Sequence, residues 1–495
     1  MVDTIGIVGA ASIGVSVLGN IVDTVASGPD PITLIDPRPP GAGPVFNCEN
    51  SLILCNTSAA IGSLLPHKPS DFLNYLASCG RPTNPEAFTS RDVVSEYTRA
   101  RYTEYVARAA VRGCEVRHHR GRVRSVRRRE GGGYEVHLDD GVALEFDRIV
   151  ICVGFASAKI ADGITPYIRH PRVVLSPYPG SLLRQRVTGT RSRVLILGTR
   201  LSAIDAALVL CDAGHQVTMA SRSGALPSVR NRMLVAPVNL PSLDRIGDLA
   251  LDDPLVHRKL TRIVIEAVRA IAPIPLRQQL SSAVDPVPRL REEVELALAG
   301  RCVWQDVWGQ LLDRIIAWTG QMPLRAREHL LSPYRTLIWQ YGASMPVGNA
   351  QKLLQHIDAG RLKLARYDPA RVAADHAGFD VGLRHGEYGR FDFVVNAVGY
   401  NYPRLYAQGD TLHLNDAPPN ATVIEHLETS LRVRMTPTAP AENIWLVGPT
   451  THINNPFANY LRGSVAQAAH VTAQLVASPQ SPAPSESAVL ANTTW

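Results

Sequence analysis

The chain has 495 residues, 45% of them hydrophobic and 19% charged, which predicts a globular protein of two or three domains with a sizeable core. The net charge is +7, but the longest basic run, residues 117–129, contains no aromatic side chain, which argues against nucleic-acid binding. No apolar run approaches the roughly 20 residues of a membrane span, and the N-terminus lacks the basic segment of a signal peptide. We therefore expect no membrane association.

The seven cysteines are scattered along the chain, with no CxxC pair and no spacing typical of metal ligands. An odd number of unpaired cysteines favours reduced, mostly buried thiols. We therefore expect a cytoplasmic protein without a metal site.

Residues 4–14 combine an apolar strand with a small-residue turn, and a helix is predicted over Val15–Val25. A second strand over residues 32–35 ends at Asp36. This βαβ pattern is typical of dinucleotide binding, in which backbone N–H groups bind the pyrophosphate and the carboxylate binds a ribose, although Ala11 replaces the middle glycine of GxGxxG. An ordinary βαβ unit in which Asp36 caps a turn is the alternative. The candidate cofactor-binding residues here are Gly9, Ala11, Ser12, Gly14, Asp36 and Arg38, the last stacking on an adenine or exposed to solvent.

Helices are expected from Ser70 and over residues 92–112, the second with Val93, Tyr97, Tyr102, Tyr105 and Val106 facing inward. A β-rich stretch follows over residues 115–146, and an apolar strand over residues 147–153 ends at Gly154.

This order of elements resembles the flavoproteins with two dinucleotide-binding domains. Within that group, residues 56–58, 72–76 and 88–91 resemble the N-hydroxylating flavin monooxygenases that act on lysine or ornithine. The resemblance implies an FAD-binding first domain in which Asn56 and Gly154 also contact the cofactor.

A second strand–turn–helix unit covers residues 192–207, with Gly198 followed by Arg200 and Ala203 at the other two glycine positions. Its next strand ends at Ser221–Arg222 rather than at an acid. A hydroxyl and a guanidinium suit a 2′-phosphate, so this unit predicts NADPH in preference to NADH. Arg200 either neutralises phosphate or points into solvent, and Arg222 has the alternative of an ordinary surface arginine. The candidate residues are Gly198, Thr199, Ser202, Ser221 and Arg222.

Residues 235–345 have a helical pattern and carry most of the tryptophans. We interpret them as an inserted helical subdomain. Helical spacing favours a core role for the tryptophans over an aromatic cage for a substrate.

Residues 391–400 repeat the pattern of residues 147–154, and the last strand ends at Gly448 before a helix over residues 460–475. The resemblance implies that Asn459, Tyr460 and Leu461 approach the flavin ring, where the helix dipole stabilises negative charge. His452, Asn454 and Asn455 would then lie near the ring or the substrate, with a loop cap as the alternative for the histidine.

The expected fold is α/β, with two Rossmann-like domains. The FAD domain is expected over residues 1–185 and 391–477, the NADPH domain over 186–235 and 341–390, the helical insertion over 236–340 and a disordered tail over 478–495.

The resemblance implies an FAD-dependent, NADPH-consuming monooxygenase of secondary metabolism that transfers oxygen from a C4a-hydroperoxyflavin to a small molecule, with O2 as co-substrate. An alignment on residues 72–76 puts the family's active-site lysine at Ser58. Ser58 is thus a candidate substrate residue, and another amine or amino acid is favoured over lysine and ornithine. A flavin dehydrogenase, a Baeyer–Villiger-type enzyme and a non-catalytic dinucleotide-binding protein stay open, as do the catalytic residues and homo-oligomerisation.

Overall fold

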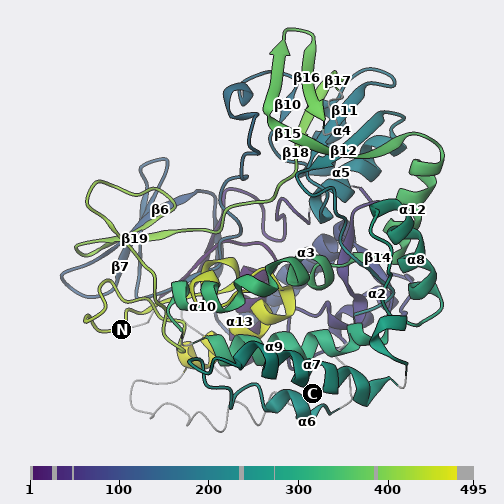
Figure 1. Cartoon of the computed structure of the whole chain (residues 1–495). Coiled ribbons are helices and arrows are strands. Elements are labelled where there is room, and N and C mark those ends of the chain that lie inside the picture. The colour runs from purple at the N-terminus through teal and green to yellow at the C-terminus, as the bar shows by residue number, and fades with distance from the viewer. Residues whose placement is uncertain are drawn as a thin grey trace.

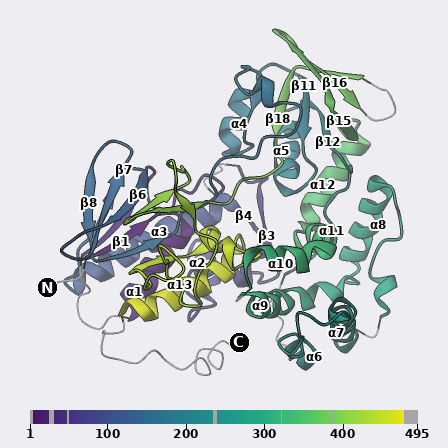
Figure 2. The same ribbon diagram turned by 60° about the vertical axis from the view of Figure 1, so that its left-hand side comes forward.

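The computed structural model describes residues 4–24, 31–46, 50–233, 239–272, 274–320, 322–383 and 388–476. The tail expected over 478–495 lies outside these residues. Three parts are visible in Figures 1 and 2: a first domain with a β-meander, a second α/β domain, and a set of helices packed against both.

The first domain is built on a parallel sheet with the order β22-β9-β1-β2-β5. Its strands are β1 (Ile5–Val8), β2 (Ile32–Ile35), β5 (Val116–His119), β9 (Arg148–Ile151) and β22 (Ile444–Leu446). Helix α1 (Ser12–Thr24) packs against α3 (Arg91–Val111) and α13 (Leu461–Val476). The close approach to α3 needs Gly19, because a Cβ there would lie 2.5 Å from the Tyr105 ring. Of the inward positions predicted on α3, Tyr97 and Tyr105 are buried, whereas Val93, Tyr102 and Val106 are half-buried.

The β-rich stretch after α3 is divided between two sheets. Its first strand, β5, is the edge of the parallel sheet, whereas β6 (Val123–Arg128), β7 (Tyr134–Leu138) and β8 (Ala143–Phe146) belong to an antiparallel sheet of order β21-β19-β20-β6-β7-β8. The other strands, β19 (Leu405–Gln408), β20 (Thr411–Leu414) and β21 (Thr422–Val423), come from far along the chain. Arginines of the basic run pair across this sheet, Arg127 with Glu135 and Arg129 with Glu145. The run is therefore a solvated, ion-paired strand face.

The second domain has the strand order β10-β18-β11-β12-β15-β16-β17, with β10 (Val173–Val174), β18 (Phe393–Asn396), β11 (Arg193–Leu197), β12 (Gln216–Ser221), β15 (Leu362–Asp375), β16 (Gly378–Leu383) and β17 (Tyr388–Phe391). The strands from β10 to β15 pair in parallel, and the last two pair antiparallel. Helices α4 (Gly180–Arg186), α5 (Leu201–Asp212) and α12 (Val347–Asp358) complete this layer.

This topology corrects the domain boundaries expected from the sequence. The sequence pattern predicts residues 173–174 and 393–396 in the first domain, but both strands lie in the second sheet, where β18 separates β10 from β11. Two-residue β10 is too short for a periodicity signal, and an apolar strand is compatible with either sheet. The two crossings between the domains therefore lie near residues 152–160 and 397–402, where Ala156 and Asn401 are joined by a backbone hydrogen bond of 3.0 Å.

The helical part contains α6 (Pro241–Asp244), α7 (Val256–Ile271), α8 (Pro286–Leu298), α9 (Trp308–Thr319), α10 (Leu324–Leu331) and α11 (Arg335–Leu337). Trp304, Trp308 and Trp318 pack against its apolar core, as the core interpretation predicted. Trp339 differs, because it is 40% exposed. Helix α8 packs on α12 of the second domain, so the helical part is not a separate lobe.

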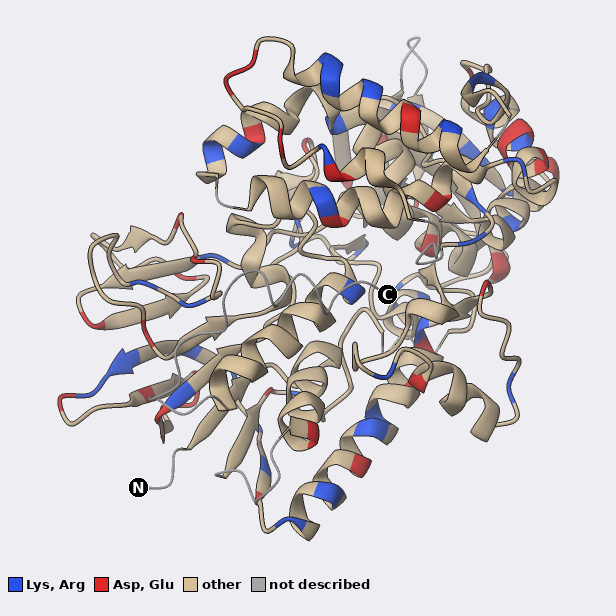
Figure 3. Ribbon diagram, turned by 90° about the horizontal axis from the view of Figure 1, so that it is seen from below, with Lys and Arg blue, Asp and Glu red and all other residues tan. Residues whose placement is uncertain are grey.

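The remaining described elements are short. They are β3 (Leu54–Ser58) and β4 (Phe88–Ser90), which pair antiparallel, α2 (Asp71–Ser78), and β13 (Val229–Arg230) paired in parallel with β14 (Met345–Pro346). Basic and acidic residues are scattered over all parts of the molecule in Figure 3. Among the described residues, no helix is both long and apolar enough to cross a membrane, and no cluster of three or more His, Cys, Asp or Glu is suited to hold a metal ion.

Candidate dinucleotide and substrate site

The turn between β1 and α1 requires glycine at two positions for steric reasons. Gly9 has φ +100°, and a Cβ there would lie 2.8 Å from the Cys152 carbonyl oxygen at the end of β9. At Gly14 a Cβ would lie 1.9 Å from the Gly9 oxygen. The first glycine thus lets the chain turn beside the neighbouring strand, and the third lets helix and strand pack closely.

Ala11, the deviation from the motif, is accommodated by a glycine elsewhere. The turn lies beneath the loop over residues 37–43, where Gly41 donates a 2.7 Å hydrogen bond to the Ala10 oxygen. A Cβ on Gly43 would lie only 3.1 Å from the Ala11 Cβ. The Ala11 methyl group therefore fits because the facing residue, Gly43, has no side chain. The Ser12 hydroxyl hydrogen-bonds Thr98 on α3 at 3.2 Å, so this side chain is engaged within the first domain.

Asp36 holds the turn and the following loop together. Its buried carboxylate accepts hydrogen bonds from the backbone N–H groups of Ala10 at 3.0 Å and Arg38 at 2.9 Å. The Arg38 Nε lies 3.4 Å from the same carboxylate, while 44% of the Arg38 side chain is exposed. The bond to Arg38 is the turn cap of the alternative interpretation, and the bond to Ala10 places the carboxylate beside the glycine turn.

Three further candidate residues lie outside the glycine turn. They are Gly154, Asn56 and Ser58. Gly154 is exposed, and no atom lies within 4 Å of the position that its Cβ would take. Asn56 is half-buried, and its backbone oxygen accepts a hydrogen bond from Arg230. The buried Ser58 hydroxyl donates to the Glu86 oxygen at 2.9 Å and accepts from the Met233 N–H at 2.7 Å. Ser58 therefore joins β3 to the segment that follows β13.

The second turn repeats the plan of the first. Gly198 has φ +125°, and a Cβ there would lie 2.6 Å from the Ala397 oxygen at the end of β18. The Thr199 hydroxyl donates to the Ala225 oxygen at 2.6 Å and hydrogen-bonds the Ser221 hydroxyl at 3.0 Å. Ser202, on the first turn of α5, is half-buried and hydrogen-bonds Tyr178.

Two arginines line the exposed end of this second unit. Arg222 follows β12 directly, and Arg366 is the register partner of Ser221 on β15. Both side chains are exposed, and neither forms an ion pair with a described residue. Nothing in the local sequence marks Arg366, because only the parallel pairing of distant strands brings it beside Ser221. The Arg200 guanidinium stacks 4.5 Å from the centroid of Trp339, and both residues are exposed.

The C-terminal segment after β22 begins at Gly448, whose N–H donates to the Gln467 side chain at 2.9 Å. The His452 ring stacks on Tyr402 with centroids 4.8 Å apart, and Nδ1 lies 3.3 Å from the Pro449 oxygen. Burial lowers the pKa of His452 to about 4, so the ring is neutral at pH 7. The contact with Pro449 matches the loop-cap alternative.

The other predicted residues of this segment surround the start of α13. The buried Asn455 side chain accepts from the Phe457 N–H at 2.9 Å, and Asn454 is half-buried. Asn459 is exposed, and Tyr460 is half-buried immediately before Leu461, the first residue of the helix.

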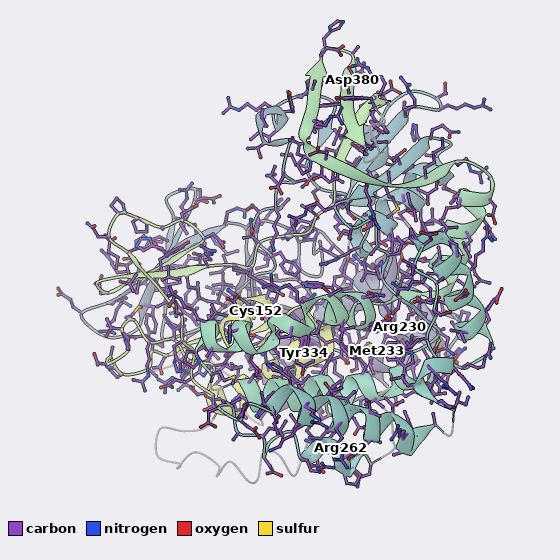
Figure 4. The ribbon with its side chains drawn as sticks, viewed as in Figure 1. Cys152, Arg230, Met233, Arg262, Tyr334 and Asp380 are labelled. Atoms are coloured by element: carbon purple, nitrogen blue, oxygen red, sulfur yellow. The ribbon has the colours of Figure 1, made fainter. Side chains whose placement is uncertain are left out.

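Two buried arginines that no local motif marks complete the site. Arg327 on α10 is 2% exposed and donates to the backbone oxygens of His452 at 2.9 Å and Ile453 at 2.7 Å, which ties the segment to the helical part. Arg230 on β13 is also 2% exposed and lies where the three parts of the molecule meet (Figure 4). Both face partners more than 100 residues away, so their burial is invisible in the local sequence.

A family model described as FAD-NAD(P)-binding matches residues 6–156, the segment that contains the first glycine turn, Asp36 and Gly154. This part of the chain is an FAD/NAD(P)-binding domain. No curated protein matches the chain.

Solved structures of N-hydroxylating enzymes match the whole fold. Ornithine hydroxylase from Pseudomonas aeruginosa, in its reduced form, is 14% identical with a TM-score of 0.59, and the match covers 96% of this chain and 99% of that one. Ornithine N-hydroxylase from Kutzneria sp. 744 is 14% identical with a TM-score of 0.58, covering 96% and 98%. L-lysine 6-monooxygenase from Pseudomonas syringae is 15% identical with a TM-score of 0.55, covering 96% and 99%. The chain therefore has the fold of the flavoprotein monooxygenases with two dinucleotide-binding domains, as its sequence predicted.

Proposed function

We propose that the chain is an FAD-dependent, NADPH-consuming monooxygenase that N-hydroxylates an amine or amino acid. The observation that carries this proposal is the pair of glycine turns built on one plan but with different polar ends. Gly9 and Gly198 each turn against a carbonyl at the end of the adjacent strand, Cys152 and Ala397 respectively. One unit ends in the carboxylate of Asp36, and the other in Ser221 and Arg222.

The first unit fits FAD. The glycine turn at Gly9 and the close packing at Gly14 leave backbone N–H groups of α1 for a pyrophosphate, and the Asp36 carboxylate lies beside them. Open space at Gly154 provides room at the end of the neighbouring strand β9. Gly9, Ala11, Ser12, Gly14, Asp36 and Gly154 would hold the cofactor.

The second unit fits NADPH better than NADH. Arg222 follows Ser221 directly and Arg366 is its register partner on β15, so two exposed arginines lie at the strand ends where the adenosine ribose of a dinucleotide is bound. A 2′-phosphate offers acceptors that match the guanidinium geometry, whereas a carboxylate at this position would repel it.

The monooxygenase class is supported by the fold shared with ornithine and lysine hydroxylases over almost the entire chain. When bound, the flavin would accept hydride from NADPH and react with O2. The chain would contribute the N-terminus of α13, whose dipole favours negative charge on a flavin ring, and a neutral, stacked His452. Ser58 is uncharged, and its hydroxyl already donates to the Glu86 oxygen and accepts from the Met233 N–H. We therefore propose a substrate other than free lysine or ornithine.

Rapid-mixing absorbance tests this proposal. The purified protein is reduced with NADPH without oxygen and then mixed with O2. A lasting near-ultraviolet band distinct from oxidised flavin supports a monooxygenase and justifies a screen of amines and amino acids. Direct return to oxidised flavin with stoichiometric peroxide would contradict it in favour of a dehydrogenase or oxidase. Absence of flavin bleaching would favour the non-catalytic alternative.

A further inference from the structure

Arg230 is a buried cation at the junction of the three parts of the molecule. It lies on β13, and its Nη1 donates to the Asn56 backbone oxygen at 3.2 Å and contacts the Met233 sulfur at 2.9 Å. Its Nη2 donates to the Gly342 oxygen at 3.1 Å. Figure 4 shows Arg230 and Met233 beside each other between the first domain and the helices.

This guanidinium has no compensating charge among the described residues. No carboxylate of the described chain forms an ion pair with it, and its Nε has no hydrogen-bond partner there. Burial lowers the pKa of Arg230 to about 10, which still leaves it charged at pH 7. An uncompensated buried ion costs several kcal/mol, so a protein that retains one normally supplies it with a counter-ion.

The neighbouring Arg232 shows the contrast within the same segment. Its guanidinium pairs with Glu86 at 2.9 Å and with Asp306 at 2.7 Å, and a third of the side chain is exposed. Arg232 is thus fully explained as a bridge between the first domain and the helical part. Arg230, two residues earlier, is more deeply buried and has no such partner.

The surroundings of Arg230 are those of the proposed active site. Asn56, which accepts its hydrogen bond, is a candidate flavin contact, and the phenol of Tyr460 lies close enough to act on its pKa. Ser58, on the same strand as Asn56, carries no charge and has its hydroxyl occupied. Among these residues Arg230 is the one cation that could bind an anion.

We propose that Arg230 binds a carboxylate of the substrate, so that the substrate is an amino acid rather than a simple amine. This rests on the proposed function, because it assigns a ligand to the same site. A carboxylate offers two oxygens to the free Nε and an adjacent nitrogen, the bidentate geometry that guanidinium groups favour. The anionic ring of reduced flavin has related chemistry and is the other source of negative charge that the test must separate.

The test compares Arg230→Met, Arg230→Lys and the matched control Arg232→Met, each purified with FAD. Melting temperatures are measured with acetate, with each proteinogenic L-amino acid and L-ornithine, and with the decarboxylated amine of each amino acid, against chloride at equal ionic strength. We expect at least one carboxylate to raise the melting temperature of the wild type and of Arg232→Met while its amine does not. Arg230→Met should lose this shift, and Arg230→Lys should keep part of it. If no carboxylate stabilises the wild type, or if Arg230→Met responds like the wild type, the proposal is wrong.

Kinetics separate the two sources of negative charge. With a stabilising amino acid as substrate, Arg230→Met should raise KM about tenfold or more while the rate of flavin reduction by NADPH stays near that of the wild type. If the KM is unchanged but the rate of flavin reduction and the flavin reduction potential change, Arg230 stabilises the reduced flavin and the substrate assignment is wrong. Binding of carboxylates to a protein without oxygenase activity would instead contradict the proposed function and leave the anion site standing.

Discussion

Gly9 and Gly198 experience the same steric constraint in two separate sheets. Each has a positive φ, and at each a side chain would collide with a backbone carbonyl at the end of the next strand. The positions that depart from the motif behave differently, since Ala11 is matched by Gly43 and Arg200 is stacked on Trp339. The glycines that remain are therefore the ones that the backbone path requires.

Gly9→Val should abolish FAD retention. A branched side chain at φ +100° is strained, and its Cβ would displace Cys152 from the end of β9. The flavin content of the purified protein, read from its visible absorbance, measures the effect. Ala11→Gly is the control, because it only removes a methyl group beside Gly43, and it should retain FAD or bind it more tightly. A fully yellow Gly9→Val protein would contradict the assignment of the first turn.

Arg222→Ala should raise the KM for NADPH about tenfold and leave that for NADH nearly unchanged, because a charge-assisted bond to the 2′-phosphate contributes roughly 1.5–3 kcal/mol. Steady-state NADPH and NADH oxidation by the FAD-loaded enzyme measures both constants. Arg366→Ala, on the neighbouring strand, should act in the same direction. Equal effects on both nucleotides would remove Arg222 from the phosphate.

At the scale of elements, the segment over residues 448–461 is held from three directions. Gln467 on α13 binds Gly448, Tyr402 stacks on His452, and Arg327 on α10 binds the backbone oxygens of His452 and Ile453. The strand end and the helix N-terminus are thus joined by a rigid turn. Such rigidity suits a surface that positions a ring cofactor.

His452 should make the stability of the protein depend on pH. The folded state lowers its pKa to about 4, whereas a histidine of the unfolded chain titrates near 6.5. Its contribution is therefore complete above about pH 6.5 and is lost as the pH falls toward 4, by at most about 3 kcal/mol. Melting temperatures of the wild type and His452→Gln between pH 4 and 8 should converge at the acidic end. The exposed His376→Gln should follow the wild type throughout, and a His452→Gln curve parallel to the wild type would refute the assignment.

At the scale of the whole molecule, a buried ion pair joins the two dinucleotide-binding domains. Arg91, the first residue of α3, lies 3.1 Å from the Asp205 carboxylate on α5 of the second domain. Tyr178 donates a hydrogen bond to the same carboxylate, and the Arg91 guanidinium stacks 5.2 Å from the Tyr178 ring. Both charged side chains are nearly buried, at 11% and 4% exposure. The pair therefore contributes to the relative placement of the two nucleotide units.

Arg91→Met and Asp205→Asn should each lower the free energy of unfolding by about 3–5 kcal/mol, because each leaves a buried group without its partner. The double variant should cost less than the sum of the two. The matched control is Arg291→Met at the pair with Asp358, whose side chains are about half exposed, and its loss should stay below about 1 kcal/mol. Thermal and urea unfolding measure these changes. Additive losses in the double variant would mean that the two side chains do not act as a pair.

Local sequence was sufficient for the elements whose signal lies within a few consecutive residues. The runs at residues 4–14 and 193–207 combine an apolar strand, a glycine turn and a helix, and both form as predicted because each segment buries its own apolar pattern. The same holds for α3 and α13, whose predicted and observed limits differ by one residue. Three of the tryptophans of the helical part also pack as their spacing indicated.

Tertiary structure alone decided which distant segments meet. Strand β18 joins the second sheet rather than the first, and Arg366 becomes the register partner of Ser221, because sheet membership depends on long-range pairing that an apolar run does not encode. Arg230 illustrates the same point at the site. No local motif marks it, yet the backbone oxygens of Asn56, 174 positions earlier, and Gly342, 112 positions later, accept hydrogen bonds from its guanidinium. Whether a charged side chain is buried depends on how the whole chain packs, and this packing is what leaves Arg230 buried without a counter-ion among the described residues.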